Sequence, residues 1–172
     1  MPVRKLKEFL KREGIRYTSI YHSLAYTSQE VAALVHIPGK DLAKTVMVKL
    51  DEKMAMAVLP ASHPIDLELL RAAAGAREAH LATEEEFRDL FPECEIGAMP
   101  PFGNLYGMEV YVTPALAENQ AIAFNAGSHH ELLKLAYEDF VRLVHPRVAK
   151  FSRKTSRNLR TRTIPKTVPP LW

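Results

Sequence analysis

The sequence predicts one α+β domain, with a mixed and mostly antiparallel β-sheet flanked by helices. Two observations predict this class. Strand-like and helix-like stretches succeed one another over residues 1–152 without the strict alternation that a doubly wound α/β fold requires. The chain has 172 residues, of which 47% are hydrophobic, so it has enough apolar material for one ordinary core. We therefore expect a single domain over residues 1–152, followed by a tail at 153–172.

Two helices are expected near the start of the chain. Apolar residues recur at helical spacing between positions 3 and 10, and Gly14 follows as a C-terminal stop. Thr27 and Glu30 have the spacing of a capping box, in which each side chain binds the backbone amide of the other. This predicts a short helix that runs to about His36.

A β-hairpin is expected next. Residues 45–50 alternate between apolar and polar side chains, and residues 51–53 can form a turn into a second strand at 54–59. Lys44 has the same strand parity as Val46, so its side chain should leave the strand on the apolar face. Either Lys44 reaches water from the strand end, or it is a cation at the mouth of a cleft.

Further helices are predicted from capping signals. Asp66 can cap a helix that Gly75 ends, and Thr83 with Glu86 forms a second capping box. Strands are expected at 108–112 and 121–124. The last helix is expected to begin at His129 and to continue to Phe140, with Ser128 and Glu131 at capping-box spacing.

The charge of the chain is divided unevenly. The formal net charge is +3, but six cations and no acid follow position 152, which leaves residues 1–152 at −3. The tail is also rich in Ser, Thr and Pro, so it has little capacity to form a core. We interpret it as an extended arm, either solvated or in contact with RNA phosphates.

Several classes of protein are disfavoured. No apolar run approaches the roughly 20 residues that span a bilayer, and the N-terminus lacks the apolar stretch of a secretory signal, so we expect a cytoplasmic protein without membrane contact. Cys94 is the single cysteine, and the histidines lack metal-ligand spacing, so no metal site is expected. Cys94 is also a poor candidate nucleophile, because the adjacent Glu93 and Glu95 raise the pKa of a thiol.

Two glycine-centred segments, 97–103 and 124–129, are the strongest candidates for a site. Glycine allows the backbone to approach a ligand closely, and proline stiffens the approach. Each segment taken alone is equally compatible with a structural connection or with a helix cap. The segments could form two walls of one pocket, with Ser128 and His129 at the start of a helix that faces a ligand.

These residues, in this order, resemble the YbaK and prolyl-tRNA synthetase-associated editing-domain family of aminoacyl-tRNA deacylases. The resemblance covers most of residues 15–152. Lys44-Thr45-Val46 is similar to the family's lysine-bearing strand, residues 97–103 to its Gly-x-x-x-Pro-x-Gly loop, and residues 127–129 to its Gly-x-His segment. The resemblance implies hydrolysis of the ester that joins a wrong amino acid to the end of a tRNA, without a metal or an organic cofactor.

The resemblance also implies roles for individual residues. Lys44 would bind the acceptor end, Gly127 would offer backbone to the ester carbonyl, and His129, or His130 beside it, would position substrate or water. The pocket that receives the amino acid would be formed by Gly97, Met99, Pro101, Phe102, Gly103 and Ser128.

The resemblance implies a tRNA partner, and prolyl-tRNA synthetase is a second candidate partner. Alanyl-tRNA for proline is the first expected substrate, with serine, threonine and cysteine as alternatives. Two other functions remain open: a non-catalytic module that binds tRNA or aminoacyl-adenosine, and an amino-acid sensor.

Overall fold

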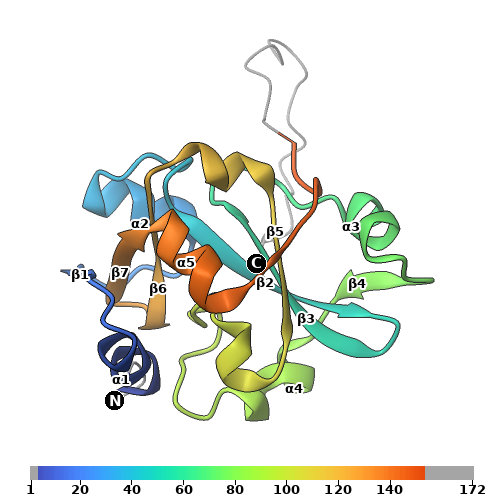
Figure 1. The fold of residues 1–172 in the computed structure, drawn as a ribbon, viewed down its shortest axis with the longest axis horizontal. Helices are drawn as coiled ribbons and strands as arrows, with labels where there is room; N and C mark the ends of the chain where they lie inside the picture. The colour runs from blue at the N-terminus through green and yellow to red at the C-terminus, as the bar shows by residue number, and fades with distance from the viewer. Residues whose placement is uncertain (1–3, 154–172) are drawn as a thin grey trace, which may run out of the picture.

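Two β-sheets form the frame of the molecule in the computed structural model, which describes residues 4–153 (Figure 1). One sheet has the order β1-β7-β6 and is antiparallel throughout. The other has the order β4-β2-β3-β5-β8, with antiparallel pairing from β4 to β3 and parallel pairing from β3 to β8. The strands are β1 (Thr18–Tyr21), β2 (Ala43–Leu50), β3 (Lys53–Pro60), β4 (Ala79–Leu81), β5 (Glu109–Val112), β6 (Ala121–Ser128), β7 (Glu131–Ala136) and β8 (Arg147–Val148).

The helices surround these two sheets (Figure 1). They are α1 (Arg4–Arg12), α2 (Ser28–Val35), α3 (Leu67–Ala74), α4 (Glu84–Phe87) and α5 (Tyr137–Val144), with short 3-10 turns at Arg88–Leu90, Gly103–Tyr106 and Pro114–Glu118. Helix α3 lies at the outer side of the five-stranded sheet, whereas α5 lies in front of the region where the sheets meet. No helix among residues 4–153 is long and apolar enough to cross a bilayer.

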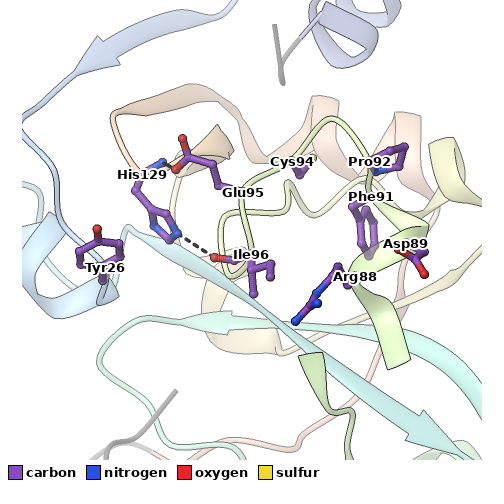
Figure 2. Close-up of a pocket in the computed structure, with 9 residues that line it drawn as sticks. All are labelled: Tyr26, Arg88, Asp89, Phe91, Pro92, Cys94, Glu95, Ile96 and His129. Carbon is purple, nitrogen blue, oxygen red and sulfur yellow. Dashed lines mark hydrogen bonds between the residues drawn. The ribbon is translucent and has the colours of Figure 1, made fainter. Parts of the chain in front are cut away.

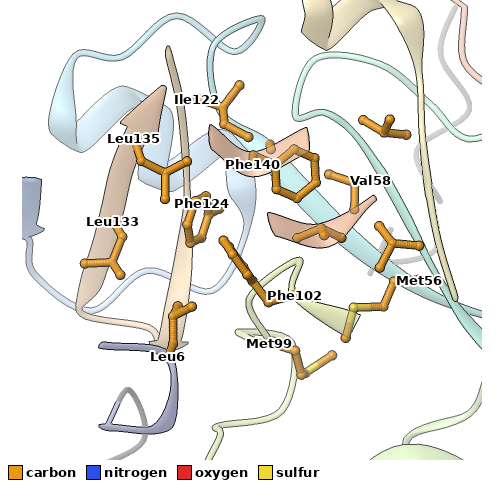
Figure 3. Packing of buried hydrophobic residues seen from close by; sticks show 14 of the residues in the cluster. Leu6, Met56, Val58, Met99, Phe102, Ile122, Phe124, Leu133, Leu135 and Phe140 are labelled. Carbon is orange, nitrogen blue, oxygen red and sulfur yellow. The ribbon is translucent and has the colours of Figure 1, made fainter. Parts of the chain in front are cut away.

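The main core lies between the two sheets and is covered by α5. Phe140 of α5, Met56 of β3 and Phe124 of β6 belong to one buried cluster, so the helix joins the two sheets through apolar contact (Figure 3). A second cluster packs α3 and Phe151 against the other face of β2 and β3. A third cluster packs α2 against β6 and β7.

The α+β class with mixed pairing is confirmed, as are most of the expected elements. The predicted hairpin is β2–β3, and its strands pair from Ala43–Pro60 to Leu50–Lys53. Both capping boxes form, at Thr27 and at Thr83, because each needs only side chains and amides three residues apart. The division into two sheets and the short strands β1, β4 and β8 were not predicted.

The prediction that the last helix begins at His129 is wrong. Residues 131–136 form β7, which lies between β1 and β6 and pairs with both, and the helix begins only at Tyr137. The expected Ser128–Glu131 capping box is absent. The Ser128 hydroxyl instead accepts a hydrogen bond from the His130 amide in the turn, and the Glu131 carboxylate forms an ion pair of 2.7 Å with Lys7. Pairing on both edges of β7 outweighed the local helical pattern of this segment.

Candidate functional site

The two glycine-centred segments are joined directly by backbone hydrogen bonds. The Glu95 amide donates to the Gly127 carbonyl over 2.8 Å, and the Gly127 amide donates to the Ala98 carbonyl over 2.8 Å. A strand irregularity between Asn125 and Ser128 allows this contact at the end of β6. The two segments therefore lie side by side, joined through their backbones.

This pairing changes the role available to Gly127. Its amide and its carbonyl are both engaged with the neighbouring loop, so its amide is not free to donate to a substrate carbonyl. Glycine is favoured at position 127 because the backbone has a φ of +94°, which residues with a Cβ rarely adopt. The amide of Gly97 is different: the residue is exposed, and its amide has no acceptor among residues 4–153.

His129 holds the loop that contains Gly97 in place (Figure 2). Its backbone amide donates to the Glu95 carboxylate over 2.8 Å, and its Nε2 donates to the Ile96 carbonyl over 2.7 Å. Only 7% of His129 is exposed, and its Nδ1 is buried without a partner in the described part of the chain. The ring of Tyr26 lies 5.1 Å from the imidazole, centroid to centroid. His129 therefore contacts the loop that contains Gly97, whereas His130 is exposed.

An open groove of about 650 Å³ lies beside this loop (Figure 2). Its lining residues are Tyr26, Arg88, Asp89, Phe91, Pro92, Cys94, Glu95, Ile96 and His129. Cys94 is half-buried, and burial raises the pKa of its thiol, with a smaller contribution from Glu93. The thiol is thus disfavoured as a nucleophile, as expected, although burial rather than the neighbouring charges is the main cause.

Arg88 was not singled out from the sequence. It follows α4 and lines the groove, and its guanidinium forms no hydrogen bond or ion pair with any residue in 4–153. No other arginine among the described residues lines the groove. A cation without an acidic partner in a groove is suited to an anionic ligand.

Lys44 lies near the start of β2, opposite Leu59 of β3, and is half-buried. Burial lowers the pKa of its ammonium group, and no hydrogen bond or ion pair to it exists among the described residues. The expected parity is correct, because Val46 and Val48 on the same side of β2 belong to the second apolar cluster. Lys44 does not line the groove of Figure 2.

The remaining residues of the first loop lie in the core. Of residues 97–103, only Gly97 is exposed. The Phe102 side chain is fully buried and packs against Phe9, Phe124 and Phe140, and Met99 belongs to the same cluster (Figure 3). Pro101 is buried too. These side chains do not line the groove, so they would affect substrate binding only by fixing the shape of the loop.

Gly103 has a packing role of its own. A Cβ at this position would lie 2.6 Å from Val110 Cγ2 and 2.8 Å from the Met108 carbonyl oxygen. Glycine is required there because the loop passes close to the strand that follows it.

A model of the aminoacyl-tRNA editing domain matches residues 22–143, which is most of the chain. The chain belongs to the aminoacyl-tRNA editing domain family. The editing domain is 27% identical over 155 residues to the multifunctional Ser/Thr-tRNA deacylase ProXp-y of Escherichia coli K12, covering 87% of this chain and 92% of that protein. It is also 32% identical over 89 residues to a proline–tRNA ligase of Bacillus cytotoxicus, covering 52% of this chain and 16% of the ligase.

Solved structures share the fold of this editing domain. A protein described only as hypothetical superposes with a TM-score of 0.79 at 21% identity, covering 87% of this chain and all of that one. A candidate trans-editing enzyme for prolyl-tRNA synthetase superposes with a TM-score of 0.76 at 19% identity, covering 88% of this chain and 97% of that one.

The editing domain offers positioning groups rather than a nucleophile. Nowhere in residues 4–153 do three His, Cys, Asp or Glu side chains gather as metal ligands. Among these described residues, the groove and its loop present the free amide of Gly97, the partnerless cation Arg88 and the imidazole that holds the loop. Lys44, the other partnerless cation, lies outside the groove lining. Arg88, Tyr26 and Glu95 were missed because no local sequence pattern places them beside His129.

Proposed function

We propose that this chain hydrolyses the ester bond of mischarged aminoacyl-tRNA, acting on tRNA that another protein has charged. The observation that carries the proposal is the match of residues 22–143 to the editing-domain family. The geometry is compatible with ester hydrolysis by water, which needs a donor for the developing oxyanion and groups that orient the ester.

The chemistry assigned to this site is simple. Water adds to the ester carbonyl carbon, the carbonyl oxygen gains negative charge, and the bond to the ribose oxygen then breaks, with a proton passing to that oxygen. The exposed amide of Gly97 is the group we assign to the oxyanion, in place of Gly127, because it has no other acceptor in the described residues. We assign Lys44 to the acceptor end of the tRNA and His129 to holding the Gly97 loop.

Small amino acids are the proposed substrates. Because one relative is named as a Ser/Thr-tRNA deacylase, we place seryl- and threonyl-tRNA first among the proposed substrates. Alanyl-tRNA for proline, which was expected from the sequence, comes after them. Cysteinyl-tRNA remains a further candidate. The similarity to part of a proline–tRNA ligase supports prolyl-tRNA synthetase as a partner that handles the same tRNA.

We propose that tRNA phosphates bind at two places on the chain. One is Arg88 in the groove, and the other is the basic tail, most of which lies outside the described residues. The segment before the tail is anchored: Ser152 bridges to Ile65, and the Arg153 guanidinium lies 3.6 Å from the Asp66 carboxylate. Cations placed on RNA release counterions, so this binding should weaken with salt.

The test is a deacylation panel. Purified protein is mixed with tRNA charged with serine, threonine, alanine or cysteine, and the release of amino acid is measured beside Lys44→Ala. We expect hydrolysis of at least one ester and a loss of at least tenfold in Lys44→Ala. If tRNA binds but no ester is hydrolysed, the chain is a binding module instead, and if free amino acid binds without RNA it is a sensor.

A further inference from the structure

Strands β2 and β6 belong to different sheets but meet at one place. Leu42, just before β2, forms a parallel bridge with Ala123 of β6, and the Ala123 amide donates to the Asp41 carbonyl over 3.1 Å. Side chains on a strand return to the same side every second residue. Lys44 and Asn125 are therefore the next residues on the same side of two neighbouring strands that run in the same direction.

Both of these side chains lack a partner. The Oδ1 atom of Asn125 is buried without a hydrogen bond, and Lys44 makes none, among residues 4–153. Their surroundings are apolar: Leu42, Ala123 and Leu132 lie in the third cluster, and Val46, Val48 and Leu59 in the second. A buried polar atom without a partner costs about 1–3 kcal/mol, so Asn125 Oδ1, which lacks one among the described residues, needs an explanation.

A ligand group that binds between them must satisfy both. Lysine is a donor only, and the Oδ1 atom of asparagine is an acceptor. A carboxylate would be repelled by Oδ1, and an ammonium group would be repelled by the charge of Lys44. A hydroxyl group both accepts and donates, and so fits the pair.

We propose that Lys44 and Asn125 bind a hydroxyl group of the substrate, which accepts from Lys44 Nζ and donates to Asn125 Oδ1. The proposal rests on the ester hydrolysis proposed above. Asn125 lies on β6, two residues before Gly127, and the backbone of Gly127 pairs with the loop that contains Gly97. Two sources share this chemistry: the free ribose hydroxyl beside the ester, and the side chain of a seryl or threonyl group.

The experiment compares Asn125→Leu with the wild type on seryl-, threonyl- and alanyl-tRNA, each with a normal or a 2′-deoxy terminal adenosine. Asn125→Leu removes the acceptor at similar size, and Asn125→Asp retains one. Thr113→Val is the matched control, because Thr113 Oγ1 is likewise buried without a partner in the described part of the chain but lies after β5. Thermal denaturation establishes that each variant is folded.

We expect Asn125→Leu to lower kcat/KM about tenfold or more on substrates that offer the hydroxyl, with Thr113→Val unchanged and Asn125→Asp losing less. A loss on seryl and threonyl but not alanyl esters assigns the hydroxyl to the amino acid. A loss on all three that disappears with 2′-deoxy adenosine assigns it to the ribose. An unchanged Asn125→Leu, or an equal loss on the alanyl 2′-deoxy ester, overturns the proposal.

A binding experiment tests this proposal independently of the proposed function. Stable analogues in which an amide replaces the ester, seryl and alanyl derivatives of 3′-amino-3′-deoxyadenosine, are titrated by calorimetry into the wild type and Asn125→Leu. If the wild type hydrolyses no ester, the proposed function fails. Weaker analogue binding by Asn125→Leu still supports hydroxyl binding in that case, whereas equal affinity, or no binding by either protein, overturns it.

Discussion

The Nε2 atom of His129 donates a 2.7 Å hydrogen bond to the carbonyl oxygen of Ile96. This bond joins the turn after β6 to the residue that precedes Gly97, and the Glu95 carboxylate strengthens the same junction by accepting from the His129 amide. The backbone conformation at Gly97 is thereby held by a side chain that is itself almost fully buried. Pre-organisation of this kind is what a site without an evident nucleophile requires.

Gly97→Ala is expected to abolish most deacylation while leaving the protein folded. Gly97 has a φ of +84°, which an alanine adopts only with strain, and the new Cβ would contact the His129 ring at 3.6 Å. Gly75→Ala is the matched control, since Gly75 has a φ of +65° at the end of α3 and no atom of the described residues lies within 4 Å of the new Cβ. Both should lose about 1 kcal/mol of stability in chemical denaturation. Equal activity in the two variants would count against a role for the Gly97 loop.

Lys44→Met should raise stability and remove activity. Burial lowers the pKa of Lys44 from the 10.5 of an exposed lysine, so at neutral pH the unfolded chain holds this proton more tightly than the folded one. Replacement should therefore stabilise the fold by about 0.5–2 kcal/mol at pH 7. The gain should shrink as the pH approaches 10.5, where the lysine loses its charge in both states.

Lys49→Met is the control for Lys44→Met. Lys49 lies on the same strand but pairs with Glu52 and Glu86, and these hydrogen bonds raise its pKa. Its replacement should cost about 0–1 kcal/mol and leave deacylation unchanged. Thermal denaturation at pH 7 and pH 10 measures both variants. A Lys44→Met gain that is identical at the two pH values would show that burial of charge is not its cause.

Arg88→Gln should weaken tRNA binding more than it slows hydrolysis of bound substrate. The guanidinium lines the groove without a partner in the described residues, and removing one cation from a phosphate should reduce the slope of log affinity against log salt by roughly 0.7–0.9. Arg142→Gln is the control, because Arg142 pairs with Asp139 on α5. A salt titration of tRNA affinity that is the same for Arg88→Gln and the wild type would remove Arg88 from the interface.

Truncation after Arg153 tests the basic tail. It removes five further cations but retains the 3.6 Å ion pair between Arg153 and Asp66. Residues 4–153 contain the described core, so the melting temperature should change little while tRNA affinity falls and becomes less sensitive to salt. Fluorescence anisotropy with labelled tRNA measures this. Binding that survives truncation intact would leave the tail without a part in tRNA recognition.

Cys94→Ala should retain activity, although Cys94 lines the groove. Burial raises the pKa of the thiol, and its nearest polar partner is the Tyr106 hydroxyl at 3.7 Å, so the reactive thiolate is disfavoured. A steady-state assay on the best ester of the panel measures this. Loss of activity in a folded Cys94→Ala protein would instead indicate a covalent route through the thiol.

Elements with short-range signals were predictable from the sequence. The helices that begin after Thr27, Asp66 and Thr83 depend on side chains that bind amides three residues ahead. The β2–β3 hairpin depends on alternation and on a turn between adjacent strands. The same reasoning predicted a helix from His129 to Phe140, but residues 131–136 of that segment form β7 although the helical pattern and the capping-box spacing were both present.

The sequence by itself determined the α+β class, the local caps and the order of Lys44, Gly97 and Gly127, on which the family resemblance rested. The tertiary structure decided which groups are free to act, because pairing between distant strands and loops cannot be deduced from local spacing. It engaged the amide of Gly127, left that of Gly97 without an acceptor among the described residues, placed Phe102 in the core, and paired Leu42 with Ala123, each two residues before Lys44 and Asn125. Each outcome follows from contacts between residues far apart in the chain.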